Sequence, residues 1–282
     1  MSLIVTASTG HLGRLVVESL LARGASADTI VATARKTDTL DLGVPTAVLD
    51  YAQPDTIAAV LGQGDTVLLV SASEPGIRFP LHKNVIDAAK AAGVARIVYT
   101  SAPAATTSAL ILAPEHKETE EYLVASGVPF TILRNGWYTE NYLGQVATGR
   151  DHGTITASVG DGRVASASRK DYADAAAVAL LDDSLAGQTF ELSGDYAWNF
   201  DELAEAISGI VGKTVTYTRL TPEEHAEQLK GFGLDEGTVG FVVALDGNIR
   251  DGLLAVTTGD LARLIGRPTT PLAEGLAEGI AE

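Results

Sequence analysis

The sequence predicts an α/β protein in which a doubly wound parallel sheet is followed by a smaller α/β lobe at the carboxyl terminus. Short apolar runs typical of buried strands alternate with helical patterns through the first half of the chain. The first apolar run leads directly into a turn of small residues and a helix, which is how a βαβ unit begins. After Arg134 the regular alternation stops, and this change marks the start of the smaller lobe.

Strands are expected where short apolar runs are bounded by turn residues. These runs are residues 3–5, 29–34, 46–49, 66–70, 96–100, 130–133 and 189–192. Apolar residues at helical spacing predict helices at residues 12–21, 55–61, 81–92, 115–126, 171–181, 200–211, 222–231 and 261–265. We therefore expect a dinucleotide-binding unit at 1–134, to which 150–192 returns, and a substrate or cap lobe made of 135–149 and 193–282.

The composition is that of a globular chain of 282 residues, 46% of them hydrophobic. Its 20 basic and 36 acidic residues give a net charge of −16, which disfavours attraction to nucleic acid or to an anionic membrane surface. No apolar run has membrane-spanning length and no cleavable signal is recognised, so a cytoplasmic location is expected. The lack of cysteine excludes disulfides, and the five histidines lack paired metal-ligand spacing, so no metal is expected.

The turn at residues 6–13 predicts a binding site for the phosphates of a nucleotide. Gly10 and Gly13 let the backbone approach an anion, and the helix that follows presents free N–H groups and the positive end of its dipole. Ala7 stands where the first glycine of the G-x-x-G-x-x-G spacing is expected, and it fits there if it keeps a negative φ. The residues expected to hold the cofactor here are Thr6, Ala7, Thr9, Gly10, His11, Leu12 and Gly13.

The end of the second strand indicates which dinucleotide is bound, because ligands of a doubly wound sheet lie at the carboxyl ends of its strands. This strand ends in Arg35 and Lys36, where an NAD-specific chain places an acidic residue. A guanidinium pairs with a 2′-phosphate, so these residues favour NADPH (NADP) as the cofactor. The alternative is that they are only a solvated basic pair.

Three further strand ends supply expected cofactor contacts. A carboxylate and a ring after the third strand can bracket an adenine, and small residues after the fourth leave room for the middle of the dinucleotide. Hydroxyls at the end of the fifth strand lie beneath the expected nicotinamide, although they can equally cap turns. In order, these residues are Asp50 and Tyr51, then Ser71, Ala72, Ser73 and Glu74, then Thr100 and Ser101.

Five stretches resemble the NmrA-like branch of the atypical short-chain dehydrogenases and reductases, in particular its quinone-reductase members. They run nearly from end to end of the chain: Thr9-Gly10-His11-Leu12-Gly13 and residues 82–94, 133–142, 160–172 and 264–270. The stretch Leu133-Arg134-Asn135-Gly136-Trp137-Tyr138-Thr139-Glu140-Asn141-Tyr142 is the most specific of them. The resemblance implies a Rossmann fold with a small carboxyl-terminal lobe, and hydride transfer from a nicotinamide cofactor to a quinone.

The Tyr-x-x-x-Lys pair of the wider superfamily is absent from this chain. Lys117 can stand at the lysine position and is the candidate catalytic residue, but Ala113 occupies the place of the tyrosine. The alternative is that Lys117 is one exposed charge on an acidic helix. Reduction of a simple ketone needs an acid nearby, whereas a quinone gives a delocalised phenolate, so positioning alone can suffice. The missing tyrosine therefore favours a quinone as the small-molecule substrate.

The segment after the sixth strand is rich in aromatic and amide side chains, which are suited to contact a quinone ring and its oxygens. The expected substrate residues are Asn135, Trp137, Tyr138, Asn141 and Tyr142, and the alternative is that the aromatic ones pack between the lobes. A second function also stays open. The chain can be a redox sensor that binds NADP without turnover and acts on a regulatory protein partner. The other protein partner considered is a second copy of the chain in a homo-oligomer.

Overall fold

The computed structural model describes residues 1–74 and 76–281; residue 282, the last of the expected cap lobe, lies outside them, as does residue 75. Seven parallel strands form the main sheet in the order β3-β2-β1-β4-β5-β6-β9. All seven correspond to predicted strands. Their bounds are β1 Leu3–Val5, β2 Ile30–Ala34, β3 Thr46–Val48, β4 Thr66–Leu69, β5 Arg96–Ser101, β6 Phe130–Asn135 and β9 Thr189–Leu192.

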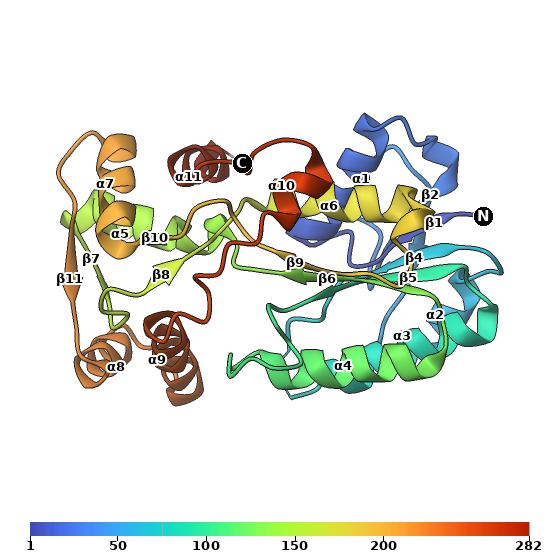
Figure 1. Ribbon diagram of the computed structural model, residues 1–282, viewed down its shortest axis with the longest axis horizontal. Helices are drawn as coiled ribbons and strands as arrows, with labels where there is room; N and C mark the ends of the chain where they lie inside the picture. The colour runs from blue at the N-terminus through green and yellow to red at the C-terminus, as the bar shows by residue number, and fades with distance from the viewer. Residues whose placement is uncertain (75, 282) are drawn as a thin grey trace.

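Helices cover both faces of this sheet, which confirms the predicted doubly wound α/β architecture (Figure 1). One face carries α1 (His11–Ala22), α6 (Arg169–Leu181) and α10 (Asp260–Ile265). The other carries α2 (Pro54–Val60), α3 (Arg78–Ala92) and α4 (Ala113–Ser126). Two short 3₁₀ turns, η1 (Ala27–Thr29) and η3 (Asp183–Leu185), complete the connections.

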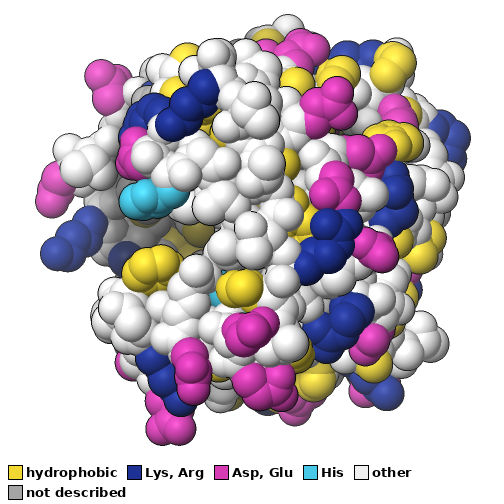
Figure 2. Space-filling model, turned by 90° about the vertical axis from the view of Figure 1, so that its left-hand side faces the viewer, with side chains coloured by type: hydrophobic (Ala, Val, Ile, Leu, Met, Phe, Trp, Pro, Cys, Tyr) yellow, Lys and Arg dark blue, Asp and Glu magenta, His cyan; other side chains and the backbone are white. Residues whose placement is uncertain are grey.

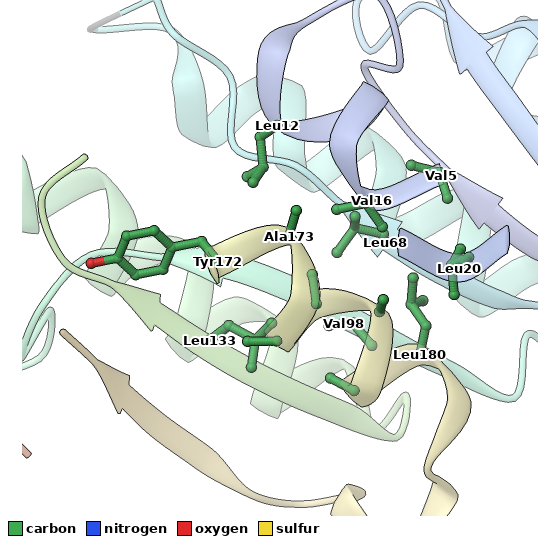
Figure 3. Close-up of a cluster of buried hydrophobic side chains, with 14 of the residues drawn as sticks. Val5, Leu12, Val16, Leu20, Leu68, Val98, Leu133, Tyr172, Ala173 and Leu180 are labelled. Atoms are coloured by element: carbon green, nitrogen blue, oxygen red, sulfur yellow. The ribbon is translucent and has the colours of Figure 1, made fainter. Parts of the chain in front are cut away.

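The helix that carries the expected phosphate site is fixed by the apolar core under the first face. Val16 and Leu20 of α1 project toward α6 and the strands, and both are fully buried (Figure 3). The face of α6 that meets them is rich in alanine, and such small side chains let the two helices approach closely. The position of the amino terminus of α1 over the sheet therefore follows from core packing.

The second lobe lies beyond the carboxyl ends of the main strands (Figure 1). Its core surrounds Trp198 and Phe200, and two small sheets pair β7 with β11 in parallel and β8 with β10 in antiparallel. Its elements are η2 Thr139–Tyr142, α5 Leu143–His152, β7 Thr154–Ala157, β8 Arg163–Val164, β10 Trp198–Asn199, α7 Phe200–Val211, β11 Thr216–Arg219, α8 Pro222–Gly231, α9 Glu236–Arg250 and α11 Leu272–Ala281. The sequence did not predict α5, α9 or α11.

Strand pairing and packing divide the chain differently from the expected boundaries. The expectation that 150–192 returns to the first unit fits α6 and β9, but β7 and β8 pair with strands of the second lobe. Conversely, Leu261 and Ile265 of α10, expected in the cap, pack in the core between the main sheet and α6. The chain therefore crosses between the two units more than once, which brings residues distant in sequence to the gap between them.

Charged side chains of both signs are interspersed over the face that the second lobe presents (Figure 2). On this lobe Arg219 pairs with Asp161 at 2.8 Å and with Asp201 at 2.5 Å, and Arg163 pairs with Glu202 at 2.6 Å. Among the described residues, no helix is both long and apolar enough to cross a membrane.

Candidate dinucleotide and substrate cleft

The turn between β1 and α1 is tighter than the sequence suggests. The carbonyl oxygen of Ala7 accepts a hydrogen bond from the N–H of Gly10 at 2.9 Å, and the N–H of Ser8 donates to the carbonyl of Thr33 at 2.8 Å. These bonds hold Ala7 at φ +52°, so the expectation of a negative φ is wrong. A left-handed conformation costs an alanine about 1 kcal/mol, and the surrounding hydrogen bonds maintain it.

Gly13 is required by the same turn. A Cβ at this position would lie 2.5 Å from the carbonyl oxygen of Ala7 and 2.8 Å from that of Thr6. Gly10, the N-cap of α1, makes no side-chain cap hydrogen bond, and the first turn carries no acidic residue. The amino-terminal N–H groups of α1 therefore stay available to an anion, and the cradle fits the phosphates of a dinucleotide.

A cleft runs from this turn across the carboxyl ends of the main strands. It consists of a cavity of about 320 Å³ near β2 and β3 and one of about 440 Å³ that reaches the second lobe. Both cavities are lined by Ala7, Gly10, Val70, Ser71, Ala72 and Ser73, so they are continuous. Small residues at the junction leave a path for an extended ligand, as the sequence predicts.

The cavity near β2 contains the residues expected around the adenosine. Arg35 lies 3.7 Å from the carboxylate of Glu74, and the two side chains are 75% and 48% exposed. Such an exposed ion pair contributes little, so Arg35 is free to pair with a phosphate instead. Asp50 accepts hydrogen bonds from the N–H of Ala52 at 2.9 Å and from Gln53 at 3.0 Å, which fixes its carboxylate at the cavity.

Tyr51 also lines this cavity, but its hydroxyl is already used. The hydroxyl donates to the carbonyl oxygen of Val70 at 2.9 Å and lies 2.5 Å from the hydroxyl oxygen of Thr6. Burial raises the pKa of Tyr51, so the phenol stays protonated. Only the ring of Tyr51 is left for contact with a ligand.

The larger cavity contains the expected substrate segment. Asn135 is 5% exposed, and its nitrogen donates to the hydroxyl of Tyr138 at 3.3 Å. Its side-chain oxygen has no hydrogen-bond partner within residues 1–74 and 76–281. Trp137 and Asn141 line the same wall, and Ser101 lines the floor. An unpaired buried acceptor is costly, so the oxygen of Asn135 is poised for a donor on a bound ligand.

The aromatic wall is held by β9 and α6 of the main-sheet unit. Gly136 donates its N–H to the carbonyl oxygen of Leu192 at 2.8 Å, and a Cβ on Gly136 would lie at the same 2.8 Å from that oxygen. The Tyr138 ring meets Tyr172 edge to face at 5.1 Å, and the guanidinium of Arg169 lies 5.2 Å from its centroid. Close backbone contact and ring packing thus fix the direction in which this wall faces.

Two predicted hydroxyl contacts lie behind the cleft and not in it. Thr6 is fully buried and donates to the carbonyl of Leu68 at 2.7 Å, and Thr100 accepts from the N–H of Ser71 at 2.9 Å. Neither lines the two cavities of the cleft, contrary to the expectation for these residues. Their side chains stabilise the strand ends that the cofactor residues occupy.

Two predicted lysine roles lack support from position. Lys36 is exposed and outside the cleft. Lys117 lies on the exposed side of α4, 3.9 Å from Glu121 and also outside the cleft, so it is not placed to act on a ligand there. Lys117 and Glu121 are one helical turn apart and both are exposed, so they pair on the solvated face of α4.

Tyr142 lies in the core of the second lobe, contrary to its expected place in the substrate pocket. It is 6% exposed and meets Trp198 at 4.8 Å and Phe200 at 5.8 Å, in both cases edge to face. Burial raises its pKa. Tyr142 therefore serves as a core residue, whereas the ring of Tyr138 packs against Tyr172 and also lines the cavity.

Sequence reasoning missed three polar residues of the cleft: Arg78, His116 and Arg169. Arg78 is buried, donates to the carbonyl of Ala72 at 2.7 Å and pairs with Glu115 at 3.3 Å. Arg169 donates to Asn141 at 3.1 Å. Helical spacing could have predicted that His116 is buried, since it shares a face with other buried residues of α4. No comparable sequence pattern indicated the position of the two arginines. Within residues 1–74 and 76–281, no cluster of three candidate metal ligands is found.

The glycine-dependent turn, the free helix terminus and the cleft across the strand ends define a dinucleotide-binding protein of the Rossmann class. A family model described as NAD(P)H-binding matches residues 7–183, which contain every strand of the main sheet except β1 and β9. The chain therefore belongs to the NmrA-like NAD(P)H-binding family.

Four comparisons, two with curated sequences and two with solved structures, extend over nearly the whole chain. Quinone oxidoreductase 2 of Escherichia coli is 42% identical over 97% of this chain and 96% of its own length. The structure of the NADPH-dependent quinone oxidoreductase of Escherichia coli with NADPH matches at a TM-score of 0.93 and 41% identity, covering 99% of each chain. The structure of triphenylmethane reductase of Citrobacter sp. with NADP(H) matches at a TM-score of 0.92 and 33% identity, covering 99% of this chain and 100% of the other. NAD(P)H azoreductase of Xenophilus azovorans is 28% identical over 96% of each chain.

Proposed function

We propose that this protein is an oxidoreductase that transfers hydride from NADPH to quinones. The observation that carries the proposal is the continuous cleft, in which a phosphate cradle and an adenosine cavity join a wall of aromatic and amide side chains. The similarity to quinone oxidoreductases over nearly the full length supports the same reaction class. The sequence motifs favour the atypical short-chain dehydrogenase/reductase branch, and the cytoplasm is the location that we propose.

The residues of the cleft divide the task of binding. The first turn of α1 would hold the pyrophosphate, and Arg35, beside Asp50 and the Tyr51 ring, would hold the adenosine with its 2′-phosphate. The bound cofactor supplies a hydride. Asn135, Trp137 and Tyr138 would orient the quinone so that its ring stacks in the cavity and its oxygens meet polar groups.

The preference for NADPH is tested by Arg35→Ala, with Lys36→Ala as the matched control because Lys36 is exposed outside the cleft. A charge-assisted hydrogen bond contributes roughly 1.5–3 kcal/mol, so Arg35→Ala should lower the NADPH-to-NADH affinity ratio about tenfold or more. Lys36→Ala should leave the ratio within about twofold. Calorimetric titration of both nucleotides measures these ratios, and an unchanged ratio in Arg35→Ala contradicts the placement of the 2′-phosphate.

The reaction is tested by steady-state assay with NADPH and a panel that contains 1,4-benzoquinone and 2-methyl-1,4-naphthoquinone. Loss of the reduced-nicotinamide absorbance that depends on both quinone and protein is the expected result. Binding of NADP at micromolar affinity with no turnover of any quinone would instead favour the redox sensor with a protein partner, and would remove the reductase function.

A further inference from the structure

His116 combines deep burial with an unused ring nitrogen at the cleft. It lies in the first turns of α4, is 5% exposed and lines the larger cavity together with Ser101 and Asn135. Its Nδ1 lies 2.7 Å from the hydroxyl of Tyr99. For Nε2, no hydrogen-bond partner is found among the residues that the structure describes. His116 lines the cavity, so a ring N–H that no described residue uses is available to a ligand atom there.

The contact with Tyr99 assigns the proton on the ring. A phenol hydroxyl is a strong donor and a neutral imidazole nitrogen is a good acceptor, so Tyr99 donates to Nδ1 and the ring carries its hydrogen on Nε2. Burial, and next the charge of Arg78, lower the pKa of His116 to about 3. Burial raises the pKa of Tyr99. Both groups therefore stay neutral near pH 7, and Nε2–H is a donor of a residue that lines the cleft.

The second histidine of this buried region differs in the use of its nitrogens. His82 accepts from the N–H of Ala72 on Nε2 at 2.9 Å, and its Nδ1 lies 3.1 Å from the hydroxyl of Thr119. Both nitrogens are therefore occupied, and His82 does not line the cleft. Of these two histidines, His116 is the one that can reach a ligand.

We propose that the Nε2–H of His116 donates a hydrogen bond to a quinone oxygen and stabilises the phenolate that forms during reduction. The proposal rests on the quinone-reductase function. It also places a donor near the position of the missing superfamily acid, since Ala113 stands at the tyrosine position and His116 follows three residues later on the same side of α4.

The step balances without proton loss from the protein. Hydride transfer breaks the C4–H bond of the reduced nicotinamide and moves one hydrogen and two electrons to the quinone. The nicotinamide is oxidised, and the quinone is reduced to the hydroquinone monoanion. His116 keeps its proton and donates only a hydrogen bond to the anionic oxygen, and a water proton then completes the hydroquinone. In a site with little water, such a hydrogen bond to an anion is stronger than in bulk water. The donor is in place before the negative charge develops, so no reorganisation is needed during the reaction.

The first test compares His116→Ala with His116→Gln, whose amide can donate from a similar position. Removal of one such donor costs about 100-fold in kcat, so His116→Ala should show a loss of this order and His116→Gln should recover most of it. The loss should be larger for methyl-substituted benzoquinones than for chloro-substituted ones, because the methyl-substituted phenolates are more basic and accept stronger hydrogen bonds. Tyr99→Phe tests the residue that positions His116, and its kcat is expected to lie between those of the wild type and His116→Ala.

The second test does not depend on turnover. The complex with NADP⁺ is titrated with 4-nitrophenol, whose absorbance distinguishes phenol from phenolate. Wild type and His116→Gln should bind the phenolate form, and His116→Ala should bind it about tenfold more weakly or worse. A cooperative thermal transition and an unchanged NADPH affinity in each variant establish that it is folded.

The outcomes separate this inference from the function on which it rests. Quinone turnover in the wild type, with kcat and phenolate affinity unchanged in His116→Ala, overturns the role of His116 and leaves the reductase function in place. Absence of quinone turnover in the wild type, with phenolate binding that depends on His116, overturns the function and leaves His116 as a donor to bound oxyanions.

Discussion

Replacement of Gly13 by alanine tests whether the turn from β1 to α1 holds the cofactor by close backbone approach. The added Cβ would lie 2.5 Å from the carbonyl oxygen of Ala7, which is 0.9 Å short of the 3.4 Å at which ordinary contacts begin. The obstructing atoms belong to the backbone, so the turn or the start of α1 must shift. Overpacking of this kind costs about 1–3 kcal/mol. We expect a melting temperature lower by about 2–4 °C for each kcal/mol, and NADPH affinity at least about tenfold lower.

Gly144→Ala is the matched control for this substitution. Gly144 also lies in the first turn of a helix, α5, but a Cβ there meets no atom of the described residues within 4 Å. Alanine is the better helix former by about 1 kcal/mol, so the control should equal or exceed the wild type in stability and keep its NADPH affinity. Thermal unfolding and calorimetric titration measure both quantities. If Gly13→Ala behaves like Gly144→Ala in both, the close approach at Gly13 has no role in stability or cofactor binding.

Two further predictions concern buried ionisable groups. Burial lowers the pKa of both His82 and His116 to about 3, so the unfolded chain binds more protons than the folded one between pH 3 and pH 6.5. The contribution of these histidines to the free energy of unfolding is therefore complete above pH 6.5 and is lost as the pH falls. Urea unfolding at pH 5 should show about 2 kcal/mol less stability per histidine than at pH 6.5. If His116→Gln leaves the dependence of stability on pH unchanged, this prediction is contradicted. Arg134 holds the buried Glu120 at 2.6 Å and Glu191 at 2.7 Å. Arg134→Met should cost about 3–5 kcal/mol in urea unfolding and Arg134→Met with Glu120→Gln less, whereas a single variant as stable as wild type refutes the role of this ion-pair network.

The expected cofactor contacts that line the cleft are the ones that belong to a single turn or strand end. Gly10, Arg35 and Ser71 each follow a strand, and parallel strands bring their carboxyl ends to one edge of the sheet whatever the rest of the chain does. Local sequence pattern is sufficient for such positions. It was insufficient for Lys117, because helical spacing alone leaves open which charged residue of α4 faces the cleft.

The alternation of strands and helices, the glycine turn and the residues at the strand ends could be predicted from the sequence, since these features depend on neighbours in the chain. The tertiary structure alone decided that Arg169 reaches the cleft from α6, that Tyr142 turns into the core against Trp198, and that Ala7 takes a left-handed conformation. Each of these outcomes depends on contacts between segments far apart in sequence. Packing and hydrogen bonding between such segments can outweigh the local conformational preference of a residue, and the periodicity of the sequence contains no information about these contacts.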